Sequence, residues 1–462
     1  MYMNGQLGHW MSNLPADVQT RRPVDDDMNV DIAIIGGGMT GLWAAYFAKT
    51  LEPSLSVAVF EAERLGFGAS GRNGGWASAL VPGNRAKFSK ATGQGLDGSR
   101  ALQREFLNAV DELLGFLQEE SIDADQHKGG TLSAAHTPAG LKRLLAKRQT
   151  DLHYGFEENE VMVLDPDEFR SRIGIAGVKG GLFYKDVARL NPAKMVQGLA
   201  KSVERKGVQI FEASRVDSAE RSILSVNGHR VIAARTFICT EGYSAPFLGP
   251  RRLIPINSSM IVTRPLPESA WDRMGWAGNE CLNDSAHTFI YAQRTADNRI
   301  AIGGRGAPYR FASGTGGQGA TASSTVRQLQ SKLEAFFPAV QFDVDHAWSG
   351  VLGVSRDWNG SVDWDPVTGM GHSGGYAGHG VTSAFVGGRT LAELALEKKS
   401  SRTSLPWVGY TAPKWEPEPL RWVGVHSMYR LFGLADKWEE HRGSTSTSML
   451  AKFGSRLAGL HE

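Results

Sequence analysis

The stretch DIAIIGGGMTG at residues 31–41 decides the fold. Its apolar half, Ile32 to Ile35, is typical of a buried parallel strand, and its glycines run directly into a helix-forming segment at residues 42–48. A second predicted strand, Ser56 to Phe60, ends at Glu61, about 20 to 25 residues beyond the turn, where a ribose hydroxyl needs an acceptor. Strand, glycine turn, helix, strand and acid together predict a dinucleotide-binding βαβ unit.

The residue types in this turn suit that ligand. Gly36 permits the tight turn, Gly38 lets the backbone approach a pyrophosphate at the positive end of the helix, and Gly41 allows close contact between helix and strand. Met39 and Thr40 complete the fingerprint, and Glu61 would bind the adenosine ribose. The alternative is a glycine-rich loop in an ordinary α/β domain, because the chain holds 55 glycines.

Composition bounds the class of protein. At 462 residues the chain is long enough for two domains or for one large domain with insertions. Lys and Arg number 50 against 48 Asp and Glu, a net charge of +2, so we expect no nucleic-acid partner. The two cysteines, Cys239 and Cys281, cannot form a disulfide framework, and the N-terminus lacks the apolar core of a signal peptide. We therefore expect a cytoplasmic protein, and no apolar run is long enough for a membrane span.

The order of predicted elements indicates an α/β fold with an inserted antiparallel sheet. A strand from Val231 to Cys239 returns to the nucleotide fold, whereas residues 255–304 are rich in strands. The predicted division is an N-terminal arm at 1–28, a discontinuous dinucleotide-binding domain at 29–90, 155–250 and 340–400, a substrate domain at 91–154 and 251–339, and a helical C-terminal extension at 401–462.

The C-terminal extension carries four tryptophans, and residues 420–438 could form an amphipathic helix. Packing on the parent domain is the favoured role for this helix. A dimer contact or a membrane surface is the alternative.

One fingerprint alone leaves the identity of the dinucleotide open. A flavoprotein that is reduced by NAD(P)H commonly has a second dinucleotide site, so its absence suggests that electrons come from the substrate. NAD as the sole cofactor would explain the fingerprint, but it gives no reason for the glycine-rich loop at residues 66–75.

Four separated motifs carry a family resemblance. They are the GGGMTG turn followed by Glu61, GASGRNGG at residues 68–75, ICTEGYS at 238–244, and GYAGHGVT at 375–382. Together they resemble the glycine oxidase and D-amino-acid oxidase superfamily of FAD enzymes. Within it, the chain is most similar to the amine oxidoreductases that are like gamma-glutamylputrescine oxidoreductase. The resemblance implies a Rossmann-like FAD-binding domain with an inserted antiparallel-sheet substrate domain.

The resemblance also implies which residues bind FAD. The flavin and the pyrophosphate would lie along Ser70, Arg72, Asn73, Gly74 and Gly75, with Ala62 beside Glu61 at the ribose. The backbone of Val216 would reach the adenine, Thr240 and Gly242 would flank the diphosphate, and Gly378, His379, Gly380, Val381 and Thr382 would donate N–H groups to the pyrimidine end of the flavin. Residues 62–80 contain no histidine and neither cysteine lies near the last motif, so we expect FAD to be bound non-covalently. No metal site is predicted.

The substrate class is predicted from one position at which this chain differs from relatives that oxidise amino acids. Relatives that oxidise amino acids bind the substrate carboxylate with an arginine in a pattern like the one after Trp348, but this chain has Leu352 there. Arg356, four residues on, could serve instead or could form a structural ion pair. The favoured reaction is hydride transfer from a primary or secondary amine to flavin, which gives an imine and then an aldehyde. The alternatives are an FAD-dependent amino-acid oxidase and a non-catalytic flavin-bound electron-transfer subunit.

The candidate residues around the substrate are mostly aromatic. Tyr291, His379 and Trp348 are the predicted catalytic-site residues, Trp76 is a further candidate for the wall, and Arg305 could bind an anionic group on the substrate. Each has a structural alternative, such as a core aromatic or a capping histidine. Oxygen or a quinone would accept the electrons.

Overall fold

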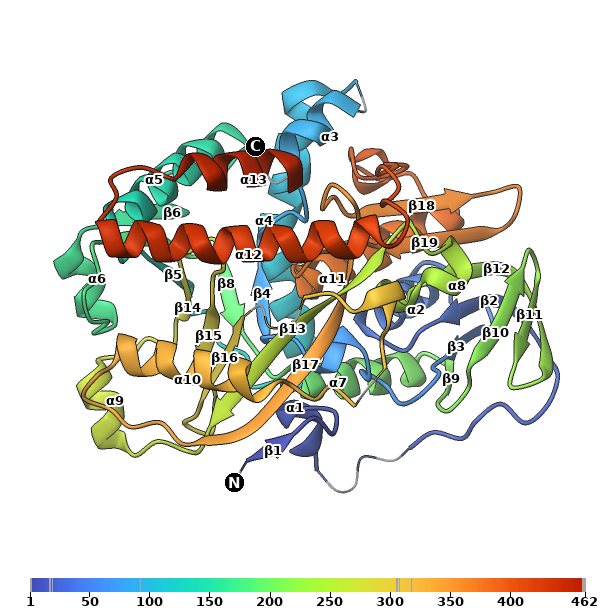
Figure 1. The fold of residues 1–462 in the computed structure, drawn as a ribbon. Helices are drawn as coiled ribbons and strands as arrows, with labels where there is room; N and C mark the ends of the chain where they lie inside the picture. Colours follow the sequence, from blue (N-terminus) through green and yellow to red (C-terminus); the bar gives the residue numbers. More distant parts are fainter. Residues whose placement is uncertain are drawn as a thin grey trace.

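The computed structural model describes residues 2–15, 18, 20–91, 93–304, 306, 308–316 and 318–458. The chain is built on two sheets, which lie side by side in Figure 1. We name them after a central strand of each: the β2 sheet, on the right of the figure, and the β13 sheet, at its left and centre.

The β2 sheet contains the strand predicted from the opening motif. Its order is β10 (Val216–Glu220), β11 (Ile223–Val226), β12 (His229–Ile238), β2 (Met28–Ile35), β3 (Val57–Phe60) and β9 (Gln209–Phe211), with β19 (Met370–Gly374) beside β12 and β18 (Ser361–Asp365) beside β19. Strands β9, β3, β2, β12 and β19 run parallel. Because Ile35 lies opposite both Phe60 and Ile238, these strands end together, and the residues that follow them share one edge of the sheet.

The β13 sheet is mostly antiparallel. Its order is β1 (Met3–Asn4), β17 (Val344–Val354), β13 (Ile254–Thr263), β16 (Ile300–Gly304), β15 (Tyr291–Arg294), β14 (Cys281–Asp284), β5 (Thr131–Ala134), β7 (Gly181–Tyr184) and β6 (Val161–Leu164). A short pair, β4 (Trp76–Ser78) with β8 (Val187–Arg189), lies apart from both large sheets.

The predicted domain ranges cut across the β13 sheet. Strands β6 and β7 fall within 155–250 and β17 falls within 340–400, both of which were expected in the dinucleotide-binding domain. The reason is that strand pairing between distant segments leaves no local signal, so short apolar strands such as β7 look alike in either sheet.

Helices cover both sheets and form the C-terminal region. They are α1 (His9–Ser12), α2 (Met39–Leu51), α3 (Arg85–Ala91), α4 (Gly95–Glu119), α5 (Pro138–His153), α6 (Pro166–Arg172), α7 (Pro192–Arg205), α8 (Ala245–Leu248), α9 (Glu268–Met274), α10 (Ser323–Phe336), α11 (Gly380–Ala395), α12 (Leu420–Arg442) and α13 (Met449–Ala458). Short 3-10 turns occur at η1 (Ala69–Gly71), η2 (Glu241–Tyr243), η3 (Phe311–Ser313) and η4 (Arg402–Ser404).

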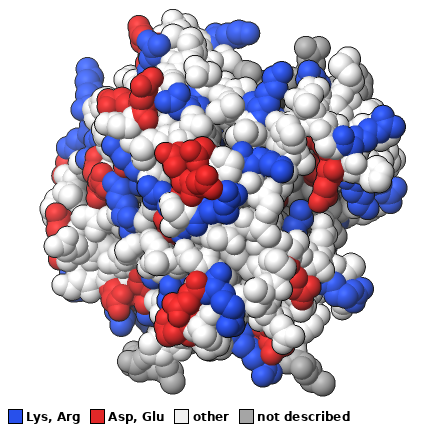
Figure 2. All heavy atoms as spheres, turned by 90° about the vertical axis from the view of Figure 1, so that its left-hand side faces the viewer, with Lys and Arg blue, Asp and Glu red and all other residues white. Residues whose placement is uncertain are grey.

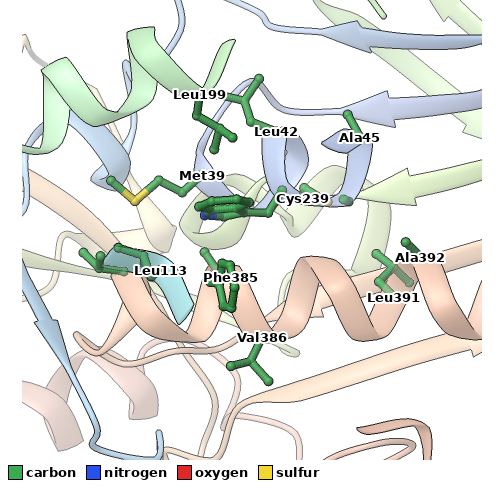
Figure 3. Packing of buried hydrophobic residues seen from close by; sticks show 14 of the residues in the cluster. Met39, Leu42, Ala45, Leu113, Leu199, Cys239, Phe385, Val386, Leu391 and Ala392 are labelled. Carbon is green, nitrogen blue, oxygen red and sulfur yellow. The ribbon is translucent and has the colours of Figure 1, made fainter. Parts of the chain in front are cut away.

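Helix α11 packs directly against α2 in the main hydrophobic core. Trp43 of α2 is completely buried, and its ring meets Phe385 of α11 edge-to-face at 4.8 Å and Phe116 of α4 at 4.5 Å. Figure 3 shows the apolar side chains that fill the space between the two helices. A Cβ atom on Gly388 would lie 2.7 Å from Trp43 Cβ and 2.8 Å from the backbone nitrogen of Ala44, so glycine is what permits this approach. This packing joins α2, which begins in the GGGMTG turn, to α11, which begins in the motif at residues 375–382.

The C-terminal extension is helical, as predicted, and α12 runs across the front of the molecule in Figure 1. At one end Arg421 donates to the Pro250 carbonyl at 2.9 Å, and at the other the buried Glu439 pairs with Arg143 at 2.6 Å. Trp438 on the outer side of this helix is 53% exposed. The helix therefore packs on the parent chain, as expected, and still presents apolar side chains outward.

Positive and negative side chains are mixed on the face of the molecule shown in Figure 2. Basic and acidic side chains are interspersed over the face shown in Figure 2, with neither sign gathered into one large field. Within the described ranges, no helix combines the length and the apolar character that crossing a membrane requires.

The contact between α2 and β2 can be tested at Gly41. A Cβ atom there would lie 2.1 Å from the Gly36 carbonyl oxygen, a backbone atom that cannot move aside. We expect Gly41→Ala to lower the free energy of unfolding by at least about 2 kcal/mol, measured by urea titration of the apoprotein. The control is Gly115→Ala in α4, where a Cβ meets no described atom within 4 Å and the better helix former should add roughly 0.5 to 1 kcal/mol. Equal stability of the two variants would contradict the close contact.

Candidate functional site

The glycine turn lies at the shared edge where the parallel strands end. Gly36 has a φ of +107°, and a Cβ atom on it would lie 2.7 Å from the Cys239 carbonyl oxygen, so the turn passes directly over the end of β12. A Cβ atom on Gly38 would lie 2.8 Å from Ser70 Oγ. Helix α2 begins immediately after, so its first N–H groups, which have no partner within the helix, point toward this edge. The arrangement suits an anionic group at the helix N-terminus.

Glu61 lies at the same edge of the sheet, directly after the neighbouring strand β3. Its carboxylate accepts hydrogen bonds from the Gly37 N–H at 2.8 Å and the Glu63 N–H at 3.0 Å. Burial raises the pKa of this carboxyl to about 7, although the two backbone hydrogen bonds oppose the shift. The acid therefore lies beside the turn, as the spacing predicted, and its ribose contact stays a prediction. Ala62 follows it at the same edge.

The loop at residues 66–75 folds back over the start of α2. Ser70 Oγ accepts a hydrogen bond from the Met39 N–H at 2.9 Å, next to Thr40. Asn73 holds the loop together, because its amide donates to the Ser70 carbonyl at 2.9 Å and its oxygen accepts from the Gly75 N–H at 2.7 Å. Two of the predicted cofactor residues thus shape the loop through their own side chains.

The N-terminal arm and strand β17 each contribute a tryptophan that holds this loop in place. Trp10 Nε1 donates to the Asn73 carbonyl at 2.9 Å, and Trp348 Nε1 donates to the Arg72 carbonyl at 2.9 Å. The ring of His9 stacks on Trp348, with 6.3 Å between ring centroids. No local pattern links Trp10 to this loop, because Trp10 and Asn73 lie 63 residues apart in the sequence.

Trp348, a predicted catalytic-site residue, is fully buried beneath the arm. A Cβ atom on Gly8 would lie 2.7 Å from its ring, so the arm covers this side chain completely. Its contacts favour a role in positioning the Arg72 backbone over direct contact with a substrate.

Arg72 is the residue with most unused hydrogen-bonding capacity in the loop. Its side chain is buried, lies over the Phe67 ring at 4.5 Å, and donates from Nη1 to the Ser349 carbonyl at 3.3 Å. Nε and Nη2 are also buried, and neither has a partner in the described part of the chain. Burial lowers the pKa of the guanidinium. An anionic group beside it would satisfy both donors, which is what the diphosphate of FAD would provide.

The strand end at Thr240 to Gly242 contacts the β13 sheet. A Cβ atom on Gly242 would lie 2.7 Å from the Val351 side chain, so only glycine fits between the two sheets. Glu241, between them, accepts hydrogen bonds from the Gly375 N–H at 2.8 Å and the Tyr376 N–H at 3.0 Å, and burial raises the pKa of its carboxyl to about 7. Sequence analysis passed over Glu241, although an acid inside the ICTEGYS motif was the available signal.

The two hydrogen bonds that Glu241 accepts hold the backbone that leads into α11. Gly378 has a φ of +110° and is exposed, and His379 caps the helix, with its N–H donating to the Tyr376 carbonyl at 2.9 Å. The helix starts at Gly380, so the N–H groups of its first turn, including those of Val381 and Thr382, have no partner within the helix. Thr382 Oγ1 is buried and lacks a hydrogen-bond partner among the described residues. This end of α11 fits the oxygen-rich pyrimidine end of a flavin.

A row of side chains on one face of the β13 sheet faces the glycine loop. Directly paired residues of neighbouring strands share a face, and the pairs join Trp348, Met260, Gly303, Tyr291, Asn283 and Ser133 in that order. Two of the predicted wall residues, Trp348 and Tyr291, therefore belong to one row. The row runs from the N-terminal arm to β5.

Tyr291, another member of this row, also lies against the loop. A Cβ atom on Gly303 would lie 2.2 Å from its ring, and one on Gly74 would lie 2.7 Å from the same ring, so two glycines make room for it. Its hydroxyl and Ser258 Oγ are 2.8 Å apart. The Trp76 ring meets it edge-to-face, with 6.3 Å between centroids. Tyr291 and Trp76 thus form a contact pair beside the loop, and their role in binding a substrate stays a prediction.

Two further predicted residues, Arg356 and Val216, contact other parts of the chain. Arg356 forms an ion pair with Glu416 at 2.9 Å and lies over the Trp415 ring at 5.3 Å, which matches the structural alternative. Val216 is buried in the β10–β11 pair, and the nearby Ser214 N–H donates to the Glu61 carbonyl at 2.7 Å. Arg305 lies outside the described residues.

Comparison with known proteins shows the family to which the chain is similar. The chain matches the family described as "DAO: FAD dependent oxidoreductase" over residues 31–394. It is 28% identical over 400 residues to gamma-glutamylputrescine oxidoreductase of Escherichia coli (strain K12), covering 84% of this chain and 89% of that protein. It is 23% identical over 386 residues to glycine oxidase of Bacillus licheniformis, covering 79% of this chain and 93% of that protein.

Solved structures show the same fold. Glycine oxidase from Bacillus cereus ATCC 14579 superposes with a TM-score of 0.63 at 15% identity, over 81% of this chain and 97% of that one. L-Proline dehydrogenase from P. horikoshii superposes with a TM-score of 0.66 at 18% identity, over 82% and 98%. The predicted α/β fold class and family resemblance are confirmed. With a family match that spans most of its length, the chain belongs to the DAO family of FAD-dependent oxidoreductases.

Proposed function

We propose that this chain oxidises the C–N bond of a primary or secondary amine, giving an imine that water hydrolyses to an aldehyde. The observation that carries the proposal is the environment of residues 348–356. Leu352 stands where amino-acid-oxidising relatives would place a carboxylate-binding arginine, and Arg356 is held by Glu416 and Trp415. The similarity to gamma-glutamylputrescine oxidoreductase supports an amine substrate, and the similarity to glycine oxidase favours the amino-acid alternative.

We propose that FAD is held without a covalent bond. When bound, FAD supplies the acceptor for the hydride that leaves the carbon next to the amine nitrogen. Arg72 and the N-terminus of α2 would hold its diphosphate, and Glu61 would accept from its ribose. The first turn of α11 with Thr382 would stabilise negative charge at the pyrimidine end.

The substrate side needs little acid–base chemistry from the protein. Tyr291 and Trp76 would orient the amine and exclude water, and the 2.8 Å contact of the Tyr291 hydroxyl with Ser258 supports a fixed ring position. His379, at the rim of the α11 N-terminus, would add a polar contact. The amine must be neutral to give up a hydride. We further propose a cytoplasmic enzyme with oxygen or a quinone as the electron acceptor.

Anaerobic titration tests the reaction. We expect primary or secondary amines to bleach the flavin absorbance near 450 nm, because they carry a hydride next to nitrogen, and α-amino acids to leave it unchanged for want of a carboxylate partner. Bleaching by α-amino acids alone would establish the amino-acid alternative. Bound flavin that neither class reduces would indicate an electron-transfer subunit.

Acid precipitation tests the mode of FAD binding. We expect trichloroacetic acid to leave a colourless protein pellet and a yellow supernatant, because residues 62–80 contain no histidine and neither cysteine lies near the motif at 375–382. A yellow pellet after washing would refute non-covalent binding.

Arg72 tests the placement of the diphosphate. We expect Arg72→Met to weaken FAD affinity about tenfold or more, because a buried charge-assisted hydrogen bond contributes roughly 1.5 to 3 kcal/mol. The measurement is fluorescence titration of the apoprotein with FAD. Arg170→Met, at an exposed arginine on α6, is the matched control and should bind FAD as the unmodified protein does. An unchanged FAD affinity in Arg72→Met would place the diphosphate elsewhere.

A further inference from the structure

A cavity opens behind Trp76, between the β4–β8 pair, the β13 sheet and α5. The centres of water-sized molecules can occupy about 50 Å³ of it. Its polar lining includes Trp76, Ser78, Thr131, Ser133, Asn283 and Lys147. Apolar side chains, among them Leu80, Phe156 and Val187, line the rest. A space of this size accommodates a few water molecules or one small polar end group such as a carboxylate or an amide.

Three polar atoms of the lining are buried without a hydrogen-bond partner anywhere in the described part of the chain: Trp76 Nε1, Thr131 Oγ1 and Asn283 Oδ1. Thr131 as a whole is only 6% exposed. Leaving a buried polar group unpaired costs about 1 to 3 kcal/mol, so three such groups around one cavity indicate that something else pairs with them. They comprise an N–H donor, a hydroxyl and a carbonyl acceptor.

The cavity adjoins the proposed substrate wall. Trp76 directly follows the glycine loop, and its ring contacts Tyr291 edge-to-face. Asn283 lies opposite Tyr291 on the neighbouring strand, and Ser133 lies opposite Asn283. The row of side chains that passes Tyr291 beside the loop therefore continues through Asn283 and Ser133 into the cavity. An extended molecule with one end at Tyr291 would place its other end here.

The charge of the lining favours a ligand group whose oxygen atom accepts hydrogen bonds. Lys147 and Arg85 share the single buried carboxylate of Asp151, each at 2.7 Å, and the Tyr184 hydroxyl donates to the same carboxylate at 2.8 Å. Lys147 therefore brings a cation to the lining, where it is paired with Asp151. The one carboxylate in the lining, Asp186, is already paired with Lys128 at 2.9 Å.

We infer that this cavity is a subsite for the far end of the amine substrate, and that it recognises an acyl oxygen, in a carboxylate or an amide, several methylenes from the reacting nitrogen. Trp76, Thr131 and Lys147 donate to that oxygen, Asn283 accepts from an amide N–H when there is one, and the apolar side chains contact the methylenes. The inference rests on the proposed amine oxidation for its reacting end.

Three amines of matched length test the subsite: pentylamine, 5-aminopentanoate and 5-aminopentanamide. In anaerobic flavin reduction by the holoenzyme, we expect the limiting reduction rate divided by Kd for at least one acyl-bearing amine to exceed that for pentylamine about tenfold or more, through Kd. Preference for the carboxylate alone identifies an anionic tail, and preference for both identifies a carbonyl. We expect Lys147→Met and Thr131→Val to bring this ratio within about threefold of one.

The matched control is Lys142→Met, an exposed lysine on the same helix, which should keep the full preference. A ratio near one in the unmodified enzyme, or a ratio that Lys147→Met and Thr131→Val leave unchanged, would overturn the subsite.

Calorimetry separates failure of the subsite from failure of the reaction. Pentanoate and pentanamide, which lack the amine, should bind the unmodified holoenzyme measurably and bind Lys147→Met at least about threefold more weakly. If no amine reduces the flavin but this binding pattern holds, the proposed reaction is wrong and the acyl-binding cavity stands. If neither compound binds and acyl-bearing amines show no advantage, the cavity proposal is wrong.

Discussion

The contact between Gly41 and the Gly36 carbonyl is the constraint on which the rest of the site depends. With no side chain at Gly41, α2 can begin directly above the end of β2, and its first N–H groups reach the edge where the parallel strands finish. Strand register then brings Glu61 and the end of β12 to the same edge. A larger residue at Gly41 would push the helix outward and separate its N-terminus from every partner that the edge assembles.

A second close approach extends this constraint to the end of the domain. Gly388 lets α11 pack against Trp43 and Ala44 of α2, so the N-terminus of α11 is positioned by the same helix that carries the fingerprint. The glycine loop at residues 66–75 is fixed between them by Ser70 and by two tryptophan side chains from outside the domain. Rigid parts far apart in the sequence thus support one cradle, as a precisely oriented cofactor requires.

Buried polar atoms that have no partner among the described residues mark where this cradle is incomplete by itself. Arg72 and Thr382 have them where FAD would lie, and Thr131 and Asn283 have them around the cavity behind Trp76. Such groups are costly to bury unpaired, so their clustering is more informative than any one of them. The same physical criterion supports both the cofactor placement and the distal substrate subsite.

The sequence by itself determined the nucleotide unit, because a βαβ turn is a local structure whose glycines and acid lie within about 25 residues of one another. The start of α7 is likewise a local structure, because the Asn191 side chain accepts hydrogen bonds from the N–H groups of Ala193 and Lys194 in the first turn of that helix. Only the tertiary structure decided that Trp348 lies under the N-terminal arm, that β6, β7 and β17 join one sheet, and that Asn283 and Thr131 line a common cavity. These features depend on strand pairing and packing between distant segments, and neither periodicity nor residue spacing encodes which distant segments meet.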